Sequence, residues 1–193
     1  AKSIIQKLVD SNADYVEVGF LRNCSYDKNA TLFNNIAELK KILPREQKNT
    51  KFTVMALHNK YDITKLEPND GTVEAVRVTF HDYDIDEGLE FVKKVMEKGY
   101  KCFCNPINIM GYSDQEILNL IQKINQIKPY AFSIVDTFGS MIKSDLLRIY
   151  SLLEHNLDKS IVIGLHLHEN LSLSYSLAQE FIGMRNVNRD CVI

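Results

Sequence analysis

The stretch KCFCNP (101–106) is followed by SDQEILNLIQKI (113–124) and then by FSIVD (132–136). The outer two segments are short and largely apolar, which predicts buried strands. The middle segment has apolar residues three and four positions apart, as an amphipathic helix does, at Ile117, Leu120, Ile121 and Ile124. Ser113 followed by Glu116 is a capping box that predicts where this helix begins. Strand, helix and strand in this order predict a parallel βαβ unit.

The same alternation runs through the whole chain. Strands are predicted at Tyr15–Phe20, Phe52–Leu57, Val76–Phe80, Lys101–Pro106, Phe132–Asp136, Ile161–His168 and Asp190–Ile193. Helices are predicted around the apolar stripes Ile4–Val9, Ile36–Leu43, Leu89–Met96, Ile117–Ile124 and Leu146–Tyr150. The strand starts, from residue 15 to residue 190, lie about 29 residues apart on average, and a strand with its crossover helix needs roughly 30.

This repeat predicts an α/β fold with one parallel sheet, arranged as a TIM (β/α)8 barrel. A doubly wound open sheet is the alternative, but it usually has a glycine-rich phosphate-binding turn after its first strand. The turn here is Gly19-Phe20-Leu21-Arg22. A closed barrel needs eight strands, and this chain opens on the predicted helix Lys2–Ser11. We therefore expect residues 1–193 to form one barrel domain that lacks strand one and is truncated in strand eight.

Composition narrows the class of protein. The chain has 193 residues, of which 45% are hydrophobic and 25% charged, and its net charge is −2. These values are typical of a soluble domain and argue against the basic surface that nucleic acid requires. No apolar run reaches the roughly 18 residues of a membrane span, and residues 1–10 do not resemble a secretory signal. Four cysteines without a Cys-x-x-Cys pair favour a reducing compartment, so we expect a cytoplasmic protein.

One segment suggests a metal site. Active sites of such barrels lie at the C-terminal ends of the strands, and GLHLHEN (164–170) lies at one of these ends. Residues two apart in a strand point to the same face, so His166 and His168 can converge on one ion. Imidazole ligands suit several transition metals. The alternative is a pair of hydrogen-bonded histidines without a metal.

Polar residues also interrupt or end other apolar strands. Glu17 and Arg77 each lie inside one, and we expect them to form a salt bridge because an unpaired buried charge is costly. This pair is either structural or catalytic. Asp136 and Thr137 end another strand. Three roles stay open for the Asp136 carboxylate: a functional group, a helix N-cap, or the hydrogen-bond partner of a histidine. Asn105 lies at a third strand end.

Two further histidines, His58 and His81, follow predicted strands. We interpret them as ordinary loop or cap residues. The cysteines are interpreted as small apolar packing residues.

The chain resembles the pyruvate-carboxyltransferase-like barrels, a family of TIM-barrel metallolyases of the Asp-Arg-Glu type. The stretches that show the resemblance are ADYVEVGF (13–20), VDTFGS (135–140) and GLHLHEN (164–170), and their order fits strands two, six and seven of that barrel. The likeness is strongest to 4-hydroxy-2-oxovalerate aldolase and extends to hydroxymethylglutaryl-CoA lyase and isopropylmalate synthase. The family's strand-one motif, with its Asp and Arg, would precede Ala1.

The resemblance implies that His166 and His168 ligate a divalent metal, Mn²⁺ foremost, with Mg²⁺, Co²⁺ or Zn²⁺ as alternatives. It also implies that Glu17 and Asp136 stand near the substrate as orienting or acid–base carboxylates. We add Thr137 to this catalytic group.

We assign Arg77 and Asn105 to substrate binding. Glu169 stands where many relatives have Asn.

The activity implied by the resemblance is cleavage of a 4-hydroxy-2-oxo acid to pyruvate and an aldehyde. The metal would stabilise the enolate that forms as the carbon–carbon bond breaks, and a base would take the proton of the 4-hydroxyl. Two alternatives stay open: an acyl-CoA condensing synthase of the isopropylmalate-synthase type, and a catalytically inactive barrel that serves as a binding domain. The expected partner is a small 2-oxo acid, with no nucleic acid and no membrane, and a homo-oligomer is left open.

Overall fold

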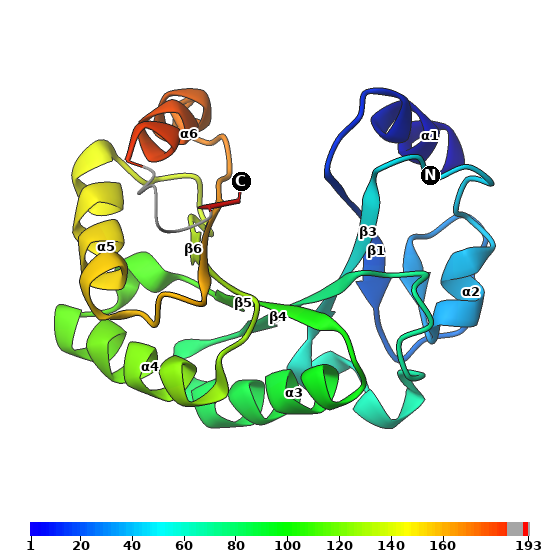
Figure 1. Ribbon diagram of the computed structural model, residues 1–193, viewed down its shortest axis with the longest axis horizontal. Coiled ribbons are helices and arrows are strands. Elements are labelled where there is room, and N and C mark those ends of the chain that lie inside the picture. Colours follow the sequence, from blue (N-terminus) through cyan, green and yellow to red (C-terminus); the bar gives the residue numbers. More distant parts are fainter. Residues whose placement is uncertain (185–190, 193) are drawn as a thin grey trace. The chain divides into compact units, whose positions relative to one another are not determined.

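The protein is an α/β structure built on a parallel sheet (Figure 1). The computed structural model describes residues 1–184 and 191–192. In this part of the chain the strands are β1 (Tyr15–Leu21), β2 (Leu32–Phe33), β3 (Lys51–Leu57), β4 (Ala75–Phe80), β5 (Lys101–Pro106), β6 (Ala131–Val135), β7 (Val162–His166) and β8 (Cys191–Val192). Their order in the sheet is β2-β1-β3-β4-β5-β6-β7-β8.

Helices alternate with these strands. They are α1 (Lys2–Asp10), α2 (Ile36–Lys40), α3 (Ile85–Glu97), α4 (Asp114–Ile127), α5 (Lys143–Asn156) and α6 (Ser174–Gly183). Short 3-10 turns follow three of the strands, η1 (His58–Lys60) with η2 (Ile63–Lys65), η3 (Asp82–Asp84) and η4 (Ile109–Gly111). No helix in the described ranges is long and apolar enough to cross a membrane.

The strand order confirms the predicted fold class. From β3 to β8 each strand lies beside its predecessor in the chain, and every pairing whose register is described is parallel. A doubly wound sheet would reverse its order at a switch point between full-length strands. Here only the two-residue β2 lies on the other side of β1, and the longer strands follow the order of the chain, as in a barrel. Val16, Val78 and Ile134, one from each of three predicted strands, are all buried.

Several element boundaries differ from the prediction. β2 and α6 were not predicted, because two residues cannot show a period and the serine-rich start of α6 has little helix propensity. The strand predicted at Ile161–His168 ends at His166. Of the strand predicted at 190–193, β8 covers Cys191–Val192, and the two outer residues lie outside the described part.

The chain forms two compact units, and each is described by itself. Unit 1 contains residues 1–79 and 90–102. Here β1 pairs with β3 and β3 with β4, and the residues that face each other include Val16 with Phe52 and Val54 with Val76, all buried. The helix α1 packs on β1 and buries Ile5. The unit therefore has its own apolar core.

Gly19 lets β2 approach β1. The register between β1 and β3 shifts between Glu17 and Phe20, which is typical of a bulge. Gly19 has a φ of 146°, and a Cβ atom there would come within 2.3 Å of the Thr31 carbonyl oxygen. The Phe20 N–H donates to that same oxygen at 2.8 Å. A side chain at position 19 would therefore push β2 away.

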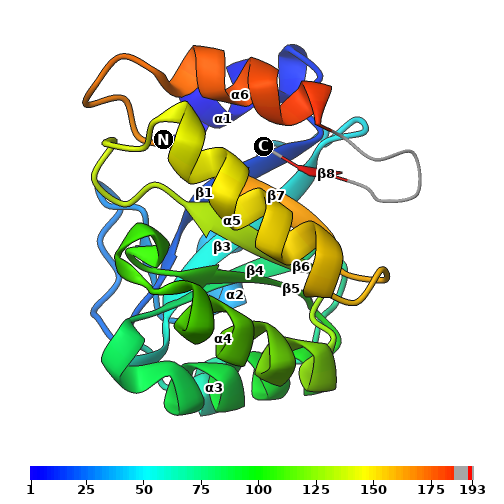
Figure 2. The ribbon, with the colours of Figure 1, turned by 90° about the vertical axis from the view of Figure 1, so that its left-hand side faces the viewer.

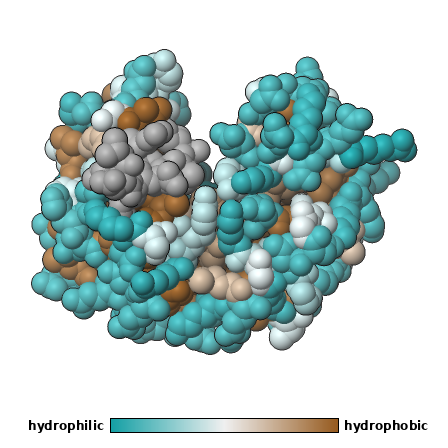
Figure 3. Space-filling model, viewed as in Figure 1, coloured by the Kyte–Doolittle hydropathy of each residue, from teal (hydrophilic) through white to brown (hydrophobic). Residues whose placement is uncertain are grey.

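Unit 2 contains residues 80–89 and 103–193. Figures 1 and 2 show α4 and α5 side by side along the outer face of β5 and β6. The apolar stripe predicted for α4 is buried against the sheet, and the predicted capping box is present, with Ser113 Oγ accepting from the Glu116 N–H. The outward-facing surface of the helices is mostly hydrophilic (Figure 3). Unit 2, like unit 1, is therefore held together by apolar side chains that its helices bury against the sheet.

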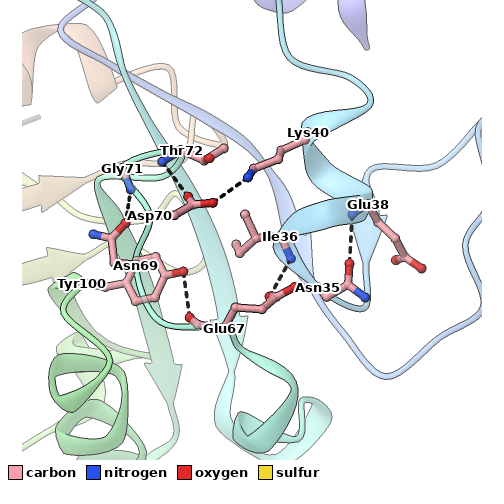
Figure 4. A network of polar contacts seen from close by, with 10 residues as sticks. All are labelled: Asn35, Ile36, Glu38, Lys40, Glu67, Asn69, Asp70, Gly71, Thr72 and Tyr100. Carbon is pink, nitrogen blue, oxygen red and sulfur yellow. Dashed lines mark hydrogen bonds and ion pairs between the residues drawn. The ribbon is translucent and has the colours of Figure 1, made fainter.

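A polar network ties the loop before β4 to its neighbours in unit 1 (Figure 4). The Tyr100 hydroxyl donates to the Glu67 carbonyl oxygen at 3.0 Å, and the Glu67 carboxylate accepts from the Ile36 N–H at the start of α2. Asp70 accepts from Lys40 and from the Thr72 N–H, and these bonds lower the pKa of Asp70. The network lies before the N-terminal end of β4, the side of a barrel sheet that serves stability.

We predict that Tyr100 makes the fold sensitive to alkali. Burial, and then the negative charges of Asp70 and Glu67, raise the pKa of Tyr100 to about 12. The neutral hydroxyl therefore contributes stability that is fully present below pH ~10, the unfolded value, and is lost as the pH rises through about 12. Tyr100→Phe should lower the free energy of unfolding by about 1 kcal/mol at neutral pH and make it fall less steeply above pH ~10.

Urea unfolding followed by circular dichroism, at neutral pH and at pH ~11, measures both effects. Tyr175→Phe is the matched control, because Tyr175 is 75% exposed and its hydroxyl accepts a hydrogen bond from the exposed side chain of Gln179 at 3.3 Å. Equal alkaline loss in Tyr100→Phe and in the wild type would contradict the prediction.

Candidate functional site

A line of hydrogen bonds connects the C-terminal ends of the strands in unit 2. The Phe80 carbonyl oxygen at the end of β4 accepts from the Ile107 N–H after β5 at 2.8 Å. The next N–H, of Asn108, donates to Thr137 Oγ1 after β6 at 2.7 Å. The Thr137 carbonyl oxygen contacts His168 Nδ1 after β7, also at 2.7 Å. We call this row of strand ends the carboxyl edge of unit 2.

His166 and His168 meet at the carboxyl edge. Their Nε2 atoms are 3.3 Å apart, and the two rings are inclined by 78° with centroids 5.0 Å apart. The prediction that they converge is therefore confirmed, although its reason was partly wrong. β7 ends at His166, so His168 reaches its place through the loop geometry and not through strand alternation.

Thr137 fixes the orientation of the His168 ring. A carbonyl oxygen can only accept, so the contact at 2.7 Å places the proton of His168 on Nδ1. The lone pair of Nε2 is then directed at His166. A metal-bound histidine commonly donates its other N–H in this manner. The Thr137 hydroxyl is itself engaged by the Asn108 N–H, so its side chain supports the loop.

Asp136 is placed beside the histidines by backbone contacts. Its N–H donates to the His166 carbonyl oxygen at 2.8 Å, and its Oδ1 accepts from the Ser140 N–H at 2.9 Å. The residue is only 1% exposed. The carboxylate therefore shapes the loop after β6. The helix N-cap considered for Asp136 is wrong, because α5 begins only after Ile142.

Gly139 allows this loop to pack against the loop after β7. Its φ is 64°, and a Cβ atom there would lie 2.5 Å from the Asn170 nitrogen and 3.0 Å from the His168 carbonyl carbon. The Leu171 N–H donates to the Gly139 carbonyl oxygen at 3.0 Å. Sequence reasoning did not single out this glycine, although a Gly two residues after the strand-end Thr137 is a turn signal.

Asn105 has a buried acceptor. The residue is 1% exposed on β5, and its Oδ1 has no hydrogen-bond partner among the described residues. An unmatched buried oxygen is costly, so a donor supplied by a ligand would be stabilising. The side-chain carboxylate of Glu169, by contrast, is already used, since it accepts from the Ser174 N–H at the start of α6.

Unit 1 contains the predicted pair of Glu17 and Arg77, and the salt bridge is confirmed. Arg77 Nε and Nη2 each donate to one oxygen of the Glu17 carboxylate at 2.7 Å, while Nη2 also approaches Met55 Sδ at 3.2 Å. The side chains of Arg77 and Glu17 are 18% and 29% exposed. The pair is thus less buried than expected. Because both carboxylate oxygens of Glu17 accept from Arg77, the carboxylate holds the guanidinium in one orientation.

The two other histidines and the buried cysteine make contacts typical of residues that support the fold. His58 begins the turn η1. His81 precedes η3, where its backbone N–H donates to Asp84 Oδ1 and its carbonyl oxygen accepts from the Asp84 N–H. Cys102 is fully buried, and burial raises the pKa of its thiol, which suits a packing role.

The residues at the carboxyl edge fit part of a metal shell. Two imidazole nitrogens that bind one ion at about 2.0–2.1 Å lie roughly 2.8–3.0 Å apart at an octahedral angle and roughly 3.3–3.4 Å apart at a tetrahedral angle. The Nε2 separation of 3.3 Å matches the tetrahedral value. Among the residues that the structure describes, no cluster of three or more His, Cys, Asp or Glu side chains could hold a metal. A metal bound here would have these two protein ligands from the described residues, and its other ligands would be water, substrate or further protein groups.

Comparison with known proteins identifies relatives in fold. No family profile and no curated protein matches the sequence. The N-terminal domain of a candidate aldolase from Bacteroides vulgatus matches 98% of this chain, with a TM-score of 0.74 and 20% identity. HMG-CoA lyase from Brucella melitensis matches 99%, with a TM-score of 0.68 and 9% identity.

The carboxyl transferase domain of Rhizobium etli pyruvate carboxylase, solved with pyruvate, matches 81% of this chain with a TM-score of 0.61 and 12% identity. The chain spans 64% of the Bacteroides chain, 71% of the Brucella chain and 29% of the Rhizobium chain. At these identities the likeness shows the fold, and it agrees with a barrel architecture.

We predict that Gly139→Ala lowers the free energy of unfolding by about 1–3 kcal/mol. Alanine would have to adopt the left-handed backbone conformation, and its Cβ atom would clash with the backbone of Asn170. Gly183→Ala is the matched control, since a Cβ atom at Gly183 meets nothing within 4 Å. Urea unfolding of both variants measures the difference. Equal stability of the two variants would show that the loops after β6 and β7 are not closely packed.

The salt bridge of unit 1 should show measurable coupling. In a double-mutant cycle with Glu17→Gln and Arg77→Met, we expect a coupling energy of about 1–2 kcal/mol, because both oxygens are engaged and both side chains are mostly shielded. The exposed pair Lys123 and Asp86 is the control, with an expected coupling below about 0.5 kcal/mol. Similar values in both cycles would contradict the special character of the Glu17 pair.

Proposed function

We propose that this chain is the catalytic part of a divalent-metal-dependent carbon–carbon lyase that cleaves a 4-hydroxy-2-oxo acid to pyruvate and an aldehyde. The observation that supports this most directly is the Nε2 separation of 3.3 Å between His166 and His168. The His168 Nε2 lone pair is directed at His166 Nε2. Without an ion it accepts a hydrogen bond from a His166 Nε2–H, and with His166 Nε2 deprotonated both lone pairs are available to one ion.

The proposed metal is Mn²⁺, with Mg²⁺, Co²⁺ or Zn²⁺ as alternatives. When bound, it would supply Lewis-acid stabilisation of negative charge on the 2-oxo group. His166 and His168 would hold it, and Thr137 would keep the His168 ring in the binding tautomer through its carbonyl oxygen. Mixed imidazole, carboxylate and water shells suit Mn²⁺.

Other residues would bind the substrate. Asn105 Oδ1 is a buried acceptor, which suits a substrate hydroxyl. Arg77 lies in unit 1 with two of its nitrogens held by Glu17, and its role in substrate binding stays a prediction. Asp136, whose Oδ1 accepts from Ser140, would act mainly by holding the loop that carries Thr137.

The fold relatives support the choice of substrate class. One of them is a candidate aldolase, one is a lyase, and one was solved with pyruvate. An acyl-CoA condensing synthase would use the same kind of metal chemistry in the bond-forming direction, and the assay below separates the two.

We predict that the purified protein binds Mn²⁺ and that His168→Ala weakens the affinity by at least about 100-fold, since a ligand matters at least as much as the groups that orient it. His155→Ala is the matched control, because His155 is exposed on α5 and its Nδ1 contacts the Ser151 carbonyl oxygen. Titration calorimetry measures binding, and a coupled assay measures pyruvate released from 4-hydroxy-2-oxo acids.

Both readouts should be lost in His168→Ala and retained in His155→Ala. Wild-type pyruvate release by His168→Ala would refute the mechanism. Consumption of an acyl-CoA with a 2-oxo acid, without pyruvate release, would favour the synthase alternative.

A further inference from the structure

His81 stands at the carboxyl edge of unit 2. It directly follows Phe80, whose carbonyl oxygen begins the line of hydrogen bonds that passes through Ile107, Asn108 and Thr137 to His168. In parallel sheets this edge is where catalytic groups lie. His81 therefore occupies the same edge of the same unit as the proposed metal ligands.

Asp84 holds the His81 ring. Its Oδ1 accepts from the His81 backbone N–H at 2.5 Å, and its Oδ2 lies 3.4 Å from His81 Nδ1. The side chain of Asp84 is only 12% exposed, whereas that of His81 is 28% exposed. A carboxylate at Nδ1 favours the tautomer with its proton on Nδ1, which leaves the lone pair of Nε2 available as a base.

The ring orientation is further restricted by Tyr83. The rings of His81 and Tyr83 are stacked, with centroids 4.8 Å apart and planes inclined by 9°. Tyr83 covers one face of the His81 ring and Asp84 contacts its Nδ1, so these two residues together restrict the orientation of the ring.

Helix capping does not account for all of these contacts. The capping interaction uses the backbone N–H of residue 81 and Oδ1 of Asp84, and any residue other than proline at position 81 would supply that N–H. The approach of Oδ2 to the ring requires an imidazole. A carboxylate that orients a histidine in this way recurs in enzymes that transfer protons.

We propose that His81, oriented by Asp84, transfers the proton in the lyase reaction. This inference rests on the proposed function. His81 Nε2 takes the proton of the substrate 4-hydroxyl, the oxygen–carbon bond becomes the aldehyde carbonyl, and the C3–C4 bond breaks with its electron pair left on the pyruvate enolate. The imidazolium, balanced by the Asp84 carboxylate, then returns the same proton to C3. No proton is gained or lost overall, because the substrate anion gives the pyruvate anion and a neutral aldehyde, and no co-reactant is needed.

The test uses a partial reaction that needs no aldehyde. In D₂O with Mn²⁺ the protein should exchange the methyl protons of pyruvate for deuterium, measured by mass spectrometry, because the same group removes and returns the C3 proton. His81→Gln should slow both exchange and cleavage by at least about 100-fold, while its Mn²⁺ affinity stays within threefold of the wild type. Asp84→Asn retains an oxygen that accepts from the His81 N–H and should slow exchange by at least about tenfold.

His155→Gln is the matched control and should exchange at the wild-type rate, since His155 lies exposed on α5. If the wild type releases pyruvate and His81→Gln exchanges at a rate within threefold of it, the role of His81 is overturned while the proposed function stands. If the wild type binds Mn²⁺ but neither cleaves 4-hydroxy-2-oxo acids nor exchanges pyruvate, both are overturned. Loss of exchange in His81→Gln with unchanged Mn²⁺ affinity supports the proposal and excludes a merely structural role.

Discussion

Parallel strand direction is the constraint on which the candidate site depends. Because β5, β6 and β7 run the same way, the residues that follow them emerge at one edge of unit 2. Backbone groups there have no further strand to pair with and bond to neighbouring loops instead, as Asn108 does with Thr137 and Thr137 with His168. The polar residues that end three separate strands are thereby brought to one place, although they are far apart in the chain.

The rigidity of the loop after β6 determines what the two histidines can do. Asp136 and Gly139 close this loop by a side-chain hydrogen bond and a left-handed backbone, and Thr137 then presents a carbonyl oxygen to His168. An imidazole fixed at Nδ1 has its Nε2 lone pair in a set direction, so less ordering entropy is lost when a ligand binds. The loop contributes to the site mainly through its backbone, and less through the Asp136 and Thr137 side chains that the sequence analysis had selected.

Polar side chains in the strands have different environments in the two units. In unit 1 the charges of Glu17 and Arg77 satisfy each other through two hydrogen bonds. In unit 2 Asn105 retains a buried oxygen without a partner in the described part of the chain. The first arrangement is stable as it stands, whereas the second is improved by a ligand, because an unmatched acceptor loses the hydrogen bond it would make in water.

Local pattern was sufficient to predict the α/β class, the parallel order, the capping box at Ser113 and the pairing of Glu17 with Arg77, because apolar periodicity and the cost of an unpaired charge are properties of the chain itself. It was insufficient for β2, for α6 and for the end of β7 at His166, where short or weakly periodic segments take their form from neighbours. The orientation of His168 by Thr137 and of His81 by Asp84 was likewise decided by tertiary structure. Hydrogen bonds between loops depend on backbone positions that no spacing of residue types encodes, so only the folded chain determines them.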